Sequence, residues 1–339
     1  MDPALAPLGW SAFQQDQLDP AERSLTAVRV SSVHRSRLDL LTTTEPLSLT
    51  VGATGDFAVG DWLLLQDGQF VRRLDRSSEL ARDAAGGVAG RQLIAANVDT
   101  LFIVTSCNAD FNLSRLERYL ALAAEAGCES VLLLTKADLA DDPDGYLRQA
   151  SGLARGLLVL AINALDPDAG AALRRWTGPG RTVALMGSSG VGKTTLMNGL
   201  TGRQDATEGI RAADAKGRHT TTNRLMVPVL DGGWLIDTPG MRELRLPDVA
   251  SGIAAVFADI EDLAATCKFN DCAHGPEPGC AVRAALSAGT LDPRRLANWM
   301  KLRGEDRHRT ETQVEARAQS RKFGKMMKKA IAQKGRKDR

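Results

Sequence analysis

The chain has 339 residues, of which 43% are hydrophobic and 25% are charged, so it can form two or three globular domains. No apolar run approaches the roughly 18 to 20 residues that a membrane-spanning helix needs. The first twenty residues lack the basic and apolar segments of a secretory signal. We therefore expect a cytoplasmic protein with no membrane partner.

Charge is unevenly distributed along the chain. The formal net charge is +2, yet residues 317–339 contain ten Lys or Arg and one acid, which gives +9 and leaves −7 for the rest. A basic tail on a mildly acidic body favours a polyanionic partner, most simply RNA, although a solvated helix or disordered tail explains the charge equally well. Apolar residues such as Phe323, Met327 and Ile331 recur at helical spacing, which predicts a basic amphipathic helix.

The amino-terminal part is expected to form a flexible arm and a small β barrel. Three prolines oppose regular structure in residues 1–20. Five short strand-like runs follow between residues 25 and 74, separated by glycine-containing turns. An OB-fold suits this pattern, but an SH3-like barrel would give nearly the same one. We assign residues 21–92 to the OB-fold and a linker rich in Ala and Gly.

From residue 93 onward, apolar strands alternate with helical patterns, which indicates a parallel sheet covered by helices on both faces. The strand over residues 182–186 leads into a phosphate-binding loop pattern that opens a helix. The backbone amides of this loop would hold phosphate oxygens, Lys193 would reach the β- and γ-phosphates, and Thr194 would bind Mg²⁺. The predicted nucleotide-binding residues of the loop are Gly187, Ser188, Ser189, Gly190, Val191, Gly192, Lys193, Thr194 and Thr195.

Two other loops are expected to recognise guanine. The strand over residues 131–135 ends in a sequence that looks like the Asn/Thr-Lys-x-Asp motif of GTPases: Thr135, Lys136 and Asp138. A carboxylate at Asp138 can accept hydrogen bonds from guanine N1–H and N2–H₂, a donor pair that adenine lacks. Asn is commoner than Thr at the position of Thr135, which slightly weakens the support that this residue gives to the base-recognition loop. Asn163 and Ala164 follow the next strand, where GTPases carry a second base-contacting loop.

The magnesium site is expected where the strand over residues 234–236 ends in Asp237, followed three residues later by Gly240. Asp237 would hold Mg²⁺ through water, and the Gly240 amide would sense the γ-phosphate. Threonines lie between the phosphate loop and Asp237, where the first switch belongs. By spacing, Thr221 is the favoured Mg²⁺ contact in the GTP state.

Catalysis would depend on Lys193, Asp237 and Gly240, but the group that orients the attacking water is not obvious. Ras-like proteins place a Gln after the glycine of the second switch. Here that residue is Met241, which cannot orient water, so intrinsic hydrolysis should be slow. Either His219 or Arg218, or the partner itself, must complete the site, and we hypothesise that His219 does.

The motifs occur in an unusual order. The base-recognition loop at residues 135–138 precedes the phosphate loop at residues 187–194, whereas ordinary GTPases place the phosphate loop first. Cutting an ordinary domain after its second switch and joining the old ends gives this order, so we expect a circularly permuted GTPase domain over residues 93–250. The segment after Gly240 then leads into the carboxyl-terminal region, which couples that region to the nucleotide state.

Three of the five cysteines lie within a 14-residue window that also contains a histidine. An odd, clustered set of this kind favours a metal over disulfides. Three thiolates and one imidazole make a closed tetrahedral site, typical of one structural zinc ion. The predicted ligands, in a helical zinc-binding domain over residues 251–339, are Cys267, Cys272, His274 and Cys280.

With these motifs the chain resembles the bacterial circularly permuted GTPases that depend on the small ribosomal subunit. The resemblance runs from about residue 8 to residue 337 and includes residues 59–62, 94–99 and 217–222. It implies an OB-fold domain, a permuted GTPase domain and a zinc domain.

The same resemblance implies a late role in maturing the small subunit, with GTP hydrolysis to GDP and phosphate stimulated by that subunit. The partners would be the small subunit and its rRNA, and we expect a monomeric enzyme. The alternative is a nucleotide-gated rRNA-binding factor for which hydrolysis is incidental.

Overall fold

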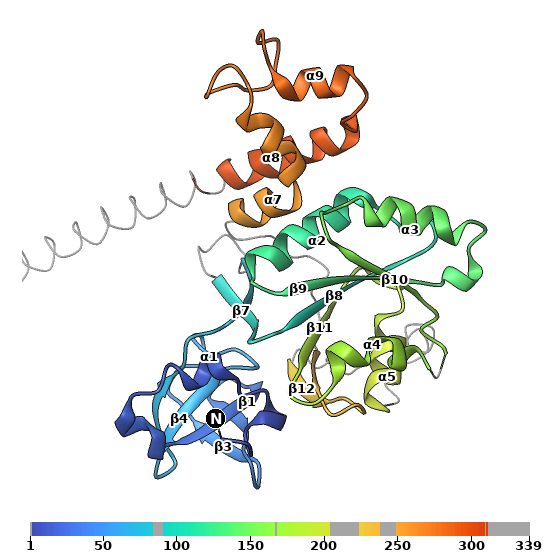
Figure 1. The fold of residues 1–339 in the computed structure, drawn as a ribbon. Coiled ribbons are helices and arrows are strands. Elements are labelled where there is room, and N and C mark those ends of the chain that lie inside the picture. The colour runs from blue at the N-terminus through green and yellow to red at the C-terminus, as the bar shows by residue number, and fades with distance from the viewer. Residues whose placement is uncertain are drawn as a thin grey trace, which may run out of the picture.

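The computed structural model describes residues 2–83, 91–166, 168–203, 224–237, 249–308 and 310. Three parts follow one another along the chain, and the amino-terminal barrel and the carboxyl-terminal helices lie at opposite ends of a central α/β domain (Figure 1). Within the described residues, no helix is both long and apolar enough to cross a membrane. The basic tail after residue 310 lies outside the described residues.

Five antiparallel strands form the partly open OB-fold barrel, and they correspond to the five predicted runs. Strand β1 is central and pairs with β2 and β4, while β3 and β5 lie at the two ends. The strands are β1 (Thr26–Val33), β2 (Arg37–Leu41), β3 (Leu47–Thr50), β4 (Trp62–Gln66) and β5 (Gln69–Arg73). Leu63 and Leu65 of β4 pack with Val28 and Leu40 in the barrel interior, whereas Trp62 faces the other way.

Residues 2–24, expected as a flexible arm up to residue 20, instead cover the barrel. They form short helices, η1 (Ala6–Leu8), α1 (Ala12–Gln15) and η2 (Pro20–Ser24). Leu5, Leu8 and Trp10 are buried, and the Trp10 and Trp62 rings meet edge to face at 4.9 Å. The prolines do not oppose this structure, because Pro7 and Pro20 lie in the first turns of η1 and η2, where proline fits. This segment buries the apolar surface on the outer side of β4.

The central domain is built on a sheet whose spatial order is β10-β9-β8-β11-β13-β12. All neighbours are parallel except β12, which is antiparallel to β13. The strands are β8 (Thr100–Ser106), β9 (Glu129–Thr135), β10 (Leu158–Ile162), β11 (Thr182–Met186), β12 (Leu225–Pro228) and β13 (Trp234–Asp237). If β11, β12 and β13 are counted as strands one to three and β8, β9 and β10 as four to six, the spatial order becomes 6-5-4-1-3-2. The strands that come first in this count come last along the chain, so the domain is circularly permuted, as predicted from the order of its motifs.

Helices cover both faces of this sheet, as the continuous apolar strands predict. Alternate residues of β8 face opposite sides: Leu101 and Ile103 join one core, while Phe102 and Val104 join the other. Helices α2 (Leu113–Glu125) and α3 (Pro143–Ser151) contribute to the first core, and α4 (Ala169–Thr177) and α5 (Lys193–Thr201) to the second.

The barrel and the central domain meet around one buried cation. Arg29 of β1 is 1% exposed and donates hydrogen bonds to the carbonyls of Leu8, Gly60 and Asn97. Asn97 adopts a left-handed backbone conformation with φ 54°, and its side-chain amide also donates to the Gly60 carbonyl. Gly60 has no space for a side chain, because a Cβ would lie 2.1 Å from the Ala96 carbonyl oxygen. Residues 59–62 and 94–99, which belong to the family resemblance, therefore form this junction.

A two-stranded hairpin, β6 (Glu79–Asp83) and β7 (Arg91–Ala96), connects the two domains. Most of the predicted Ala/Gly linker lies between these strands, outside the described residues.

The carboxyl-terminal part consists of α7 (Ala250–Val256), α8 (Ala258–Ala265), α9 (Ala281–Ser287) and a helix over residues 293–308. Helix α7 and the helix over residues 293–308 pack against α2, on the side of the central domain away from the barrel, and α8 packs between α7 and α9 (Figure 1).

Candidate functional site

The phosphate-loop sequence follows β11 and opens α5, and its glycines are required by backbone geometry. Gly187 has φ 154°, and a Cβ there would lie 2.1 Å from the Val104 carbonyl oxygen of the adjacent strand β8. Gly190 and Gly192 have φ 75° and 94°, values that favour glycine. The loop therefore turns closely over the end of β8 and delivers α5 with its amino-terminal end at the carboxyl edge of the sheet.

Lys193 lies at the first position of α5 and points back over its own loop. Its ammonium group donates to the carbonyls of Gly187, at 2.8 Å, and Ser188. Thr194 and Thr195 follow in the first turn of the helix and are half-buried. A cation and a helix amino terminus thus meet at one edge of the sheet, an arrangement that favours a phosphate group.

The predicted guanine loop is bonded directly to the phosphate loop. Thr135, 1% exposed at the end of β9, has its hydroxyl 2.6 Å from the Val191 carbonyl oxygen and 3.2 Å from that of Thr105. Lys136 has φ 56°, and its ammonium group donates to the Gly190 carbonyl at 2.9 Å. The threonine at the first position of the motif therefore supports the phosphate loop through its hydroxyl. The sequence alone, in which Asn is the commoner residue at this position, did not reveal this contact.

The remaining predicted base contacts lie at the same edge of the sheet. Asp138 is exposed in the single turn η3 (Ala137–Leu139). Ile162 and Thr135 are register partners at the ends of β10 and β9, so the loop with Asn163 and Ala164 leaves the sheet beside the loop with Asp138. Asn163 is exposed, and its side-chain oxygen accepts from the Leu165 amide at 3.0 Å. Both loops leave solvent-accessible polar groups at this edge of the sheet, and the loop with Asp138 lies against the phosphate loop.

The predicted magnesium and switch residues are only partly placed by the structure. Asp237 ends β13, which pairs with β11, so its side chain starts from the same sheet edge as the phosphate loop. Thr221, His219, Arg218, Gly240 and Met241 all lie outside the described residues. Their roles therefore stay predictions.

The four predicted metal ligands come together in space. One ligand atom from each of Cys267, Cys272, His274 and Cys280 lies within 4.8 Å of the others. His274 Nδ1 lies 3.7 Å from Cys267 Sγ and 3.6 Å from Cys280 Sγ, and the two sulfurs are 3.9 Å apart. Tetrahedral zinc with usual bond lengths would separate two sulfurs by ~3.8 Å and a sulfur from a nitrogen by ~3.5 Å. The residues therefore fit a closed four-coordinate site.

The fold affects the thiols of the cluster differently. The backbone amide of His274 lowers the pKa of Cys272, but burial and the neighbouring thiols of Cys280 and Cys267 outweigh it and raise that pKa to about 11. Cys280 caps α9, and burial, which opposes ionisation of Cys267, is outweighed by the backbone amides of Val282 and Ala281, which lower the pKa of its thiol. His274 reaches the cluster through a left-handed backbone conformation with φ 62°. Its ring packs against Trp299 at 5.4 Å, which fixes the site on the helix over residues 293–308.

A buried ionic network, not predicted from the sequence, joins the central domain to the carboxyl-terminal helices. Glu117 of α2 is 0% exposed and accepts hydrogen bonds from Arg294, Arg295 and Asn298. Arg295 also donates to the Asp259 carboxylate and to two backbone carbonyls. Burial alone would lower the pKa of Arg295, but the carboxylates of Asp259 and Glu117 raise it above its usual range, so the charged form is favoured.

The next described residues after Asp237 lie at this same interface. Val249, the first described residue after Asp237, donates its amide to the Asp306 carboxylate at 2.9 Å. In α7, Gly252 touches α2 so closely that a Cβ would lie 2.0 Å from the Ala121 carbonyl oxygen. The Gly252 amide donates to Glu125 of α2 at 3.0 Å. The end of the segment that follows Asp237 is therefore held on α2.

Comparisons with known proteins agree on one family. A protein-family model described as RsgA GTPase matches residues 73–247. A protein of Mesorhizobium japonicum, called small ribosomal subunit biogenesis GTPase RsgA, is 55% identical over 320 residues, 92% of each chain. One of Vibrio parahaemolyticus, called small ribosomal subunit biogenesis GTPase RsgA 2, is 49% identical over 335 residues, which cover 97% of this chain and 93% of the relative.

Two solved structures share the fold. YjeQ from Thermotoga maritima superposes with a TM-score of 0.62 at 22% identity, covering 83% of this chain and 98% of that one. YloQ, described as a circularly permuted GTPase, superposes with a TM-score of 0.60 at 20% identity, covering 86% and 98%.

Proposed function

The chain belongs to the RsgA GTPase family, and we propose that it hydrolyses GTP to GDP and phosphate while acting in the maturation of the small ribosomal subunit. The observation that carries this proposal is the direct bond between the two nucleotide loops. Thr135 and Lys136 of the predicted base-recognition motif bind carbonyls of the phosphate loop, so we expect the base and phosphate subsites to act as one unit. The names of its relatives supply the target, the small ribosomal subunit.

The residues divide the work between binding and charge stabilisation. The loop over residues 187–192 would surround the phosphates with backbone amides, and Lys193 would exchange its two carbonyl partners for the β- and γ-phosphates. Asp138 would accept from the guanine edge. Thr194, Thr221 and Asp237 would hold Mg²⁺, which neutralises the charge that develops on the phosphates when bound. Gly240 would sense the γ-phosphate through its amide.

Water positioning is the step for which the chain supplies no obvious group. Met241 follows Gly240 in the sequence, where a glutamine would orient the water in Ras-like proteins. We propose that His219 supplies this function once the small subunit is bound. Intrinsic turnover should then be slow and subunit-stimulated turnover fast.

We further propose that the Cys₃His cluster holds one structural zinc ion. The four residues satisfy a tetrahedral ion and leave no position for a substrate, so the ion would shape a binding surface and take no part in hydrolysis. The resulting arrangement is an OB-fold over residues 21–92, a GTPase domain over 93–250 and a zinc domain over 251–339. The basic tail would add an rRNA contact. We expect a cytoplasmic monomer, located with its ribosomal partner.

Met241 also favours a second candidate, a nucleotide-gated rRNA-binding factor for which hydrolysis is incidental. The decisive experiment is steady-state phosphate release from GTP with and without purified small subunits. The Lys193→Ala variant controls for contaminating activity. Strong stimulation of the wild type, lost in Lys193→Ala, supports the GTPase. Slow turnover that subunits leave unchanged, together with tight GTP-dependent subunit binding, would support the gated factor.

Base selectivity needs a separate measurement. Asp138→Asn should weaken GTP binding and shift preference toward xanthosine triphosphate, whose base presents an acceptor where guanine has an amino group. Unchanged GTP affinity in this variant would show that Asp138 does not contact the base.

A further inference from the structure

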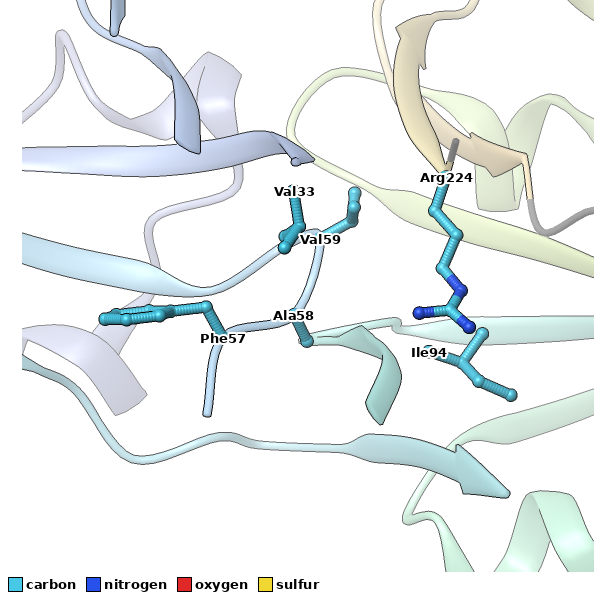
Figure 2. A pocket seen from close by; sticks show the side chains of 6 residues that line it. All are labelled: Val33, Phe57, Ala58, Val59, Ile94 and Arg224. Atoms are coloured by element: carbon cyan, nitrogen blue, oxygen red, sulfur yellow. The ribbon is translucent and has the colours of Figure 1, made fainter. Parts of the chain in front are cut away.

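We propose that a small cavity between the barrel and the GTPase domain binds one backbone phosphate of an RNA, with the Arg224 guanidinium as its ligand. This inference rests on the proposed function, because it takes the RNA of the small subunit as the partner. The cavity is lined by Val33, Phe57, Ala58, Val59, Ile94 and Arg224. Figure 2 shows Arg224 extending from its strand toward Ile94, with the two valines opposite it and the Phe57 ring turned away.

The cavity belongs to both domains at once. Val33 ends β1 of the barrel, Ile94 lies in β7, and Arg224 immediately precedes β12 of the GTPase sheet. Ser32 and Leu225 are register partners that join β1 to β12, and the Ser32 hydroxyl donates to the Arg224 carbonyl at 3.4 Å. An occupant of this cavity would therefore contact the barrel and the edge of the GTPase sheet together.

Among the described residues, Arg224 has no counter-charge of the kind that a half-buried cation usually has. Its guanidinium donates to the Leu93 carbonyl at 2.6 Å, and no acid among the described residues forms an ion pair with it. Burial, with a smaller contribution from the nearby cation Arg82, lowers the pKa of Arg224 below its usual range. A cation held away from water without an anion is unfavourable. An anionic ligand would supply the missing partner.

Size and chemistry favour a phosphate group. The cavity has a volume of about 60 Å³. One water needs ~10–15 Å³ of such volume, so the cavity suits an anion of about five non-hydrogen atoms and is too small for a whole nucleotide. The planar guanidinium still has N–H groups that the Leu93 bond does not use, and these match phosphate oxygens in a two-bond geometry.

The surroundings favour RNA as the source of the phosphate. The other lining side chains are apolar, so they offer no polar group that would recognise a particular base or the remaining oxygens of a free phosphate ion. The turn that follows Val33 carries one exposed cation, Arg35, while Arg37 at the start of β2 is paired with Asp39 at 3.1 Å. The expected contact is therefore to the RNA backbone and independent of base sequence.

The test compares three full-length variants in binding to small subunits, with a non-hydrolysable GTP analogue and KCl from 50 to 300 mM as the probe conditions. Arg224→Gln removes the charge but can still donate to the Leu93 carbonyl. Arg224→Lys keeps the charge. Arg148→Gln is the matched control, since Arg148 is an exposed arginine of α3 on another part of the domain.

We expect Arg224→Gln to bind subunits about tenfold more weakly near physiological salt, the effect of losing one charge-assisted hydrogen bond. Its slope of log K against log [KCl] should fall by about 0.7–0.9, the effect of one lost phosphate contact. Arg224→Lys should keep the wild-type slope, and Arg148→Gln should keep both slope and affinity. The inference is overturned if Arg224→Gln keeps the wild-type slope. It is also overturned if Arg224→Lys loses as much affinity as Arg224→Gln and both variants keep the wild-type slope.

Two further measurements separate the possible failures. A 12-nucleotide oligouridylate should compete with subunits for binding to the wild-type protein, whereas 5 mM inorganic phosphate at constant ionic strength should not. If inorganic phosphate competes with subunits for the wild type and no longer competes in Arg224→Gln, RNA is not the source of the bound phosphate. If the wild type neither binds subunits nor responds to them in GTP hydrolysis, the proposed function has failed. If the wild type responds and Arg224→Gln binds like it, only the cavity inference has failed.

Discussion

Replacing Glu117 with glutamine should loosen the carboxyl-terminal helices from the GTPase domain. Glu117 is 0% exposed and is the shared acceptor for Arg294, Arg295 and Asn298. Glutamine keeps the shape and one acceptor oxygen, but it removes the charge and turns an amide donor toward two cations. The interface then contains buried guanidinium groups without their central counter-ion.

The magnitude follows from what each arginine retains. Removing one partner of a buried ion pair costs about 3–5 kcal/mol. Arg295 keeps the Asp259 carboxylate and the carbonyls of Leu153 and Val256, and the side chain of Arg294 is 34% exposed, so water can solvate it. We therefore expect the lower end, about 3 kcal/mol, which corresponds to a roughly 100-fold change in an opening equilibrium.

Amide hydrogen exchange is the suitable assay, because a chain of several domains need not unfold in one step. Exchange in α7 and in the helix over residues 293–308 should accelerate roughly 100-fold in Glu117→Gln, while exchange in the barrel strands stays unchanged. The matched control is Asp262→Asn. It breaks the Arg155–Asp262 pair, which joins the same two parts, but both side chains are more than two-thirds exposed. The expected cost there is about 0–1 kcal/mol.

An increase of less than tenfold in Glu117→Gln would refute the reasoning, since the network would then not hold the interface. An equal increase in both variants would show that any charge change at the interface has the same effect. In that case burial of Glu117 would not be the cause.

Three other perturbations test the sites directly. Thr135→Val should weaken GDP binding by about 1–3 kcal/mol, because it leaves the Val191 carbonyl without its hydroxyl donor, while Thr135→Ser should bind normally in an isothermal titration. Cys280→Ser should lose the bound metal in elemental analysis of the purified protein, whereas Cys128→Ser, at a buried cysteine outside the cluster, should retain it. Gly252→Ala should lower the midpoint of thermal unfolding, since its methyl group would overlap a carbonyl of α2 and cost about 1–3 kcal/mol; an unchanged midpoint would contradict this close contact.

The sequence predicted the parts of the site that depend on local chemistry. A phosphate loop needs glycines at positive φ within a few residues, and Gly187, Gly190 and Gly192 have such angles. Metal ligands depend on residue type and short spacing, and Cys267 and Cys280 do lie together. The permuted strand order followed from the order of the motifs alone. These features carry their own evidence along the chain, so no tertiary contact was needed to find them.

Features created by distant contacts were missed. The continuous apolar run at residues 62–65 of β4 did not reveal that Trp62 faces residues 5–10, so the amino-terminal segment was interpreted as a loose arm. Arg29 and Glu117 look like ordinary surface charges, because nothing local marks a charged residue as buried. Their partners lie more than 20 and more than 170 positions away. Only tertiary packing assigns such residues to an interface.

The contacts on α2 bear on how nucleotide state could reach the carboxyl-terminal helices. Residues 238–248 connect Asp237, at the end of β13, to Val249, whose amide is held by Asp306. Gly252 leaves no room for α7 to approach α2 more closely, and Glu117 binds the helix over residues 293–308 to the same element. A packed, charge-linked interface of this kind has two states: it is either intact or separated. A signal from Asp237 would therefore move the carboxyl-terminal helices as a unit with α2 or release them from it, and the exchange experiment on Glu117→Gln measures the free energy that such a release requires.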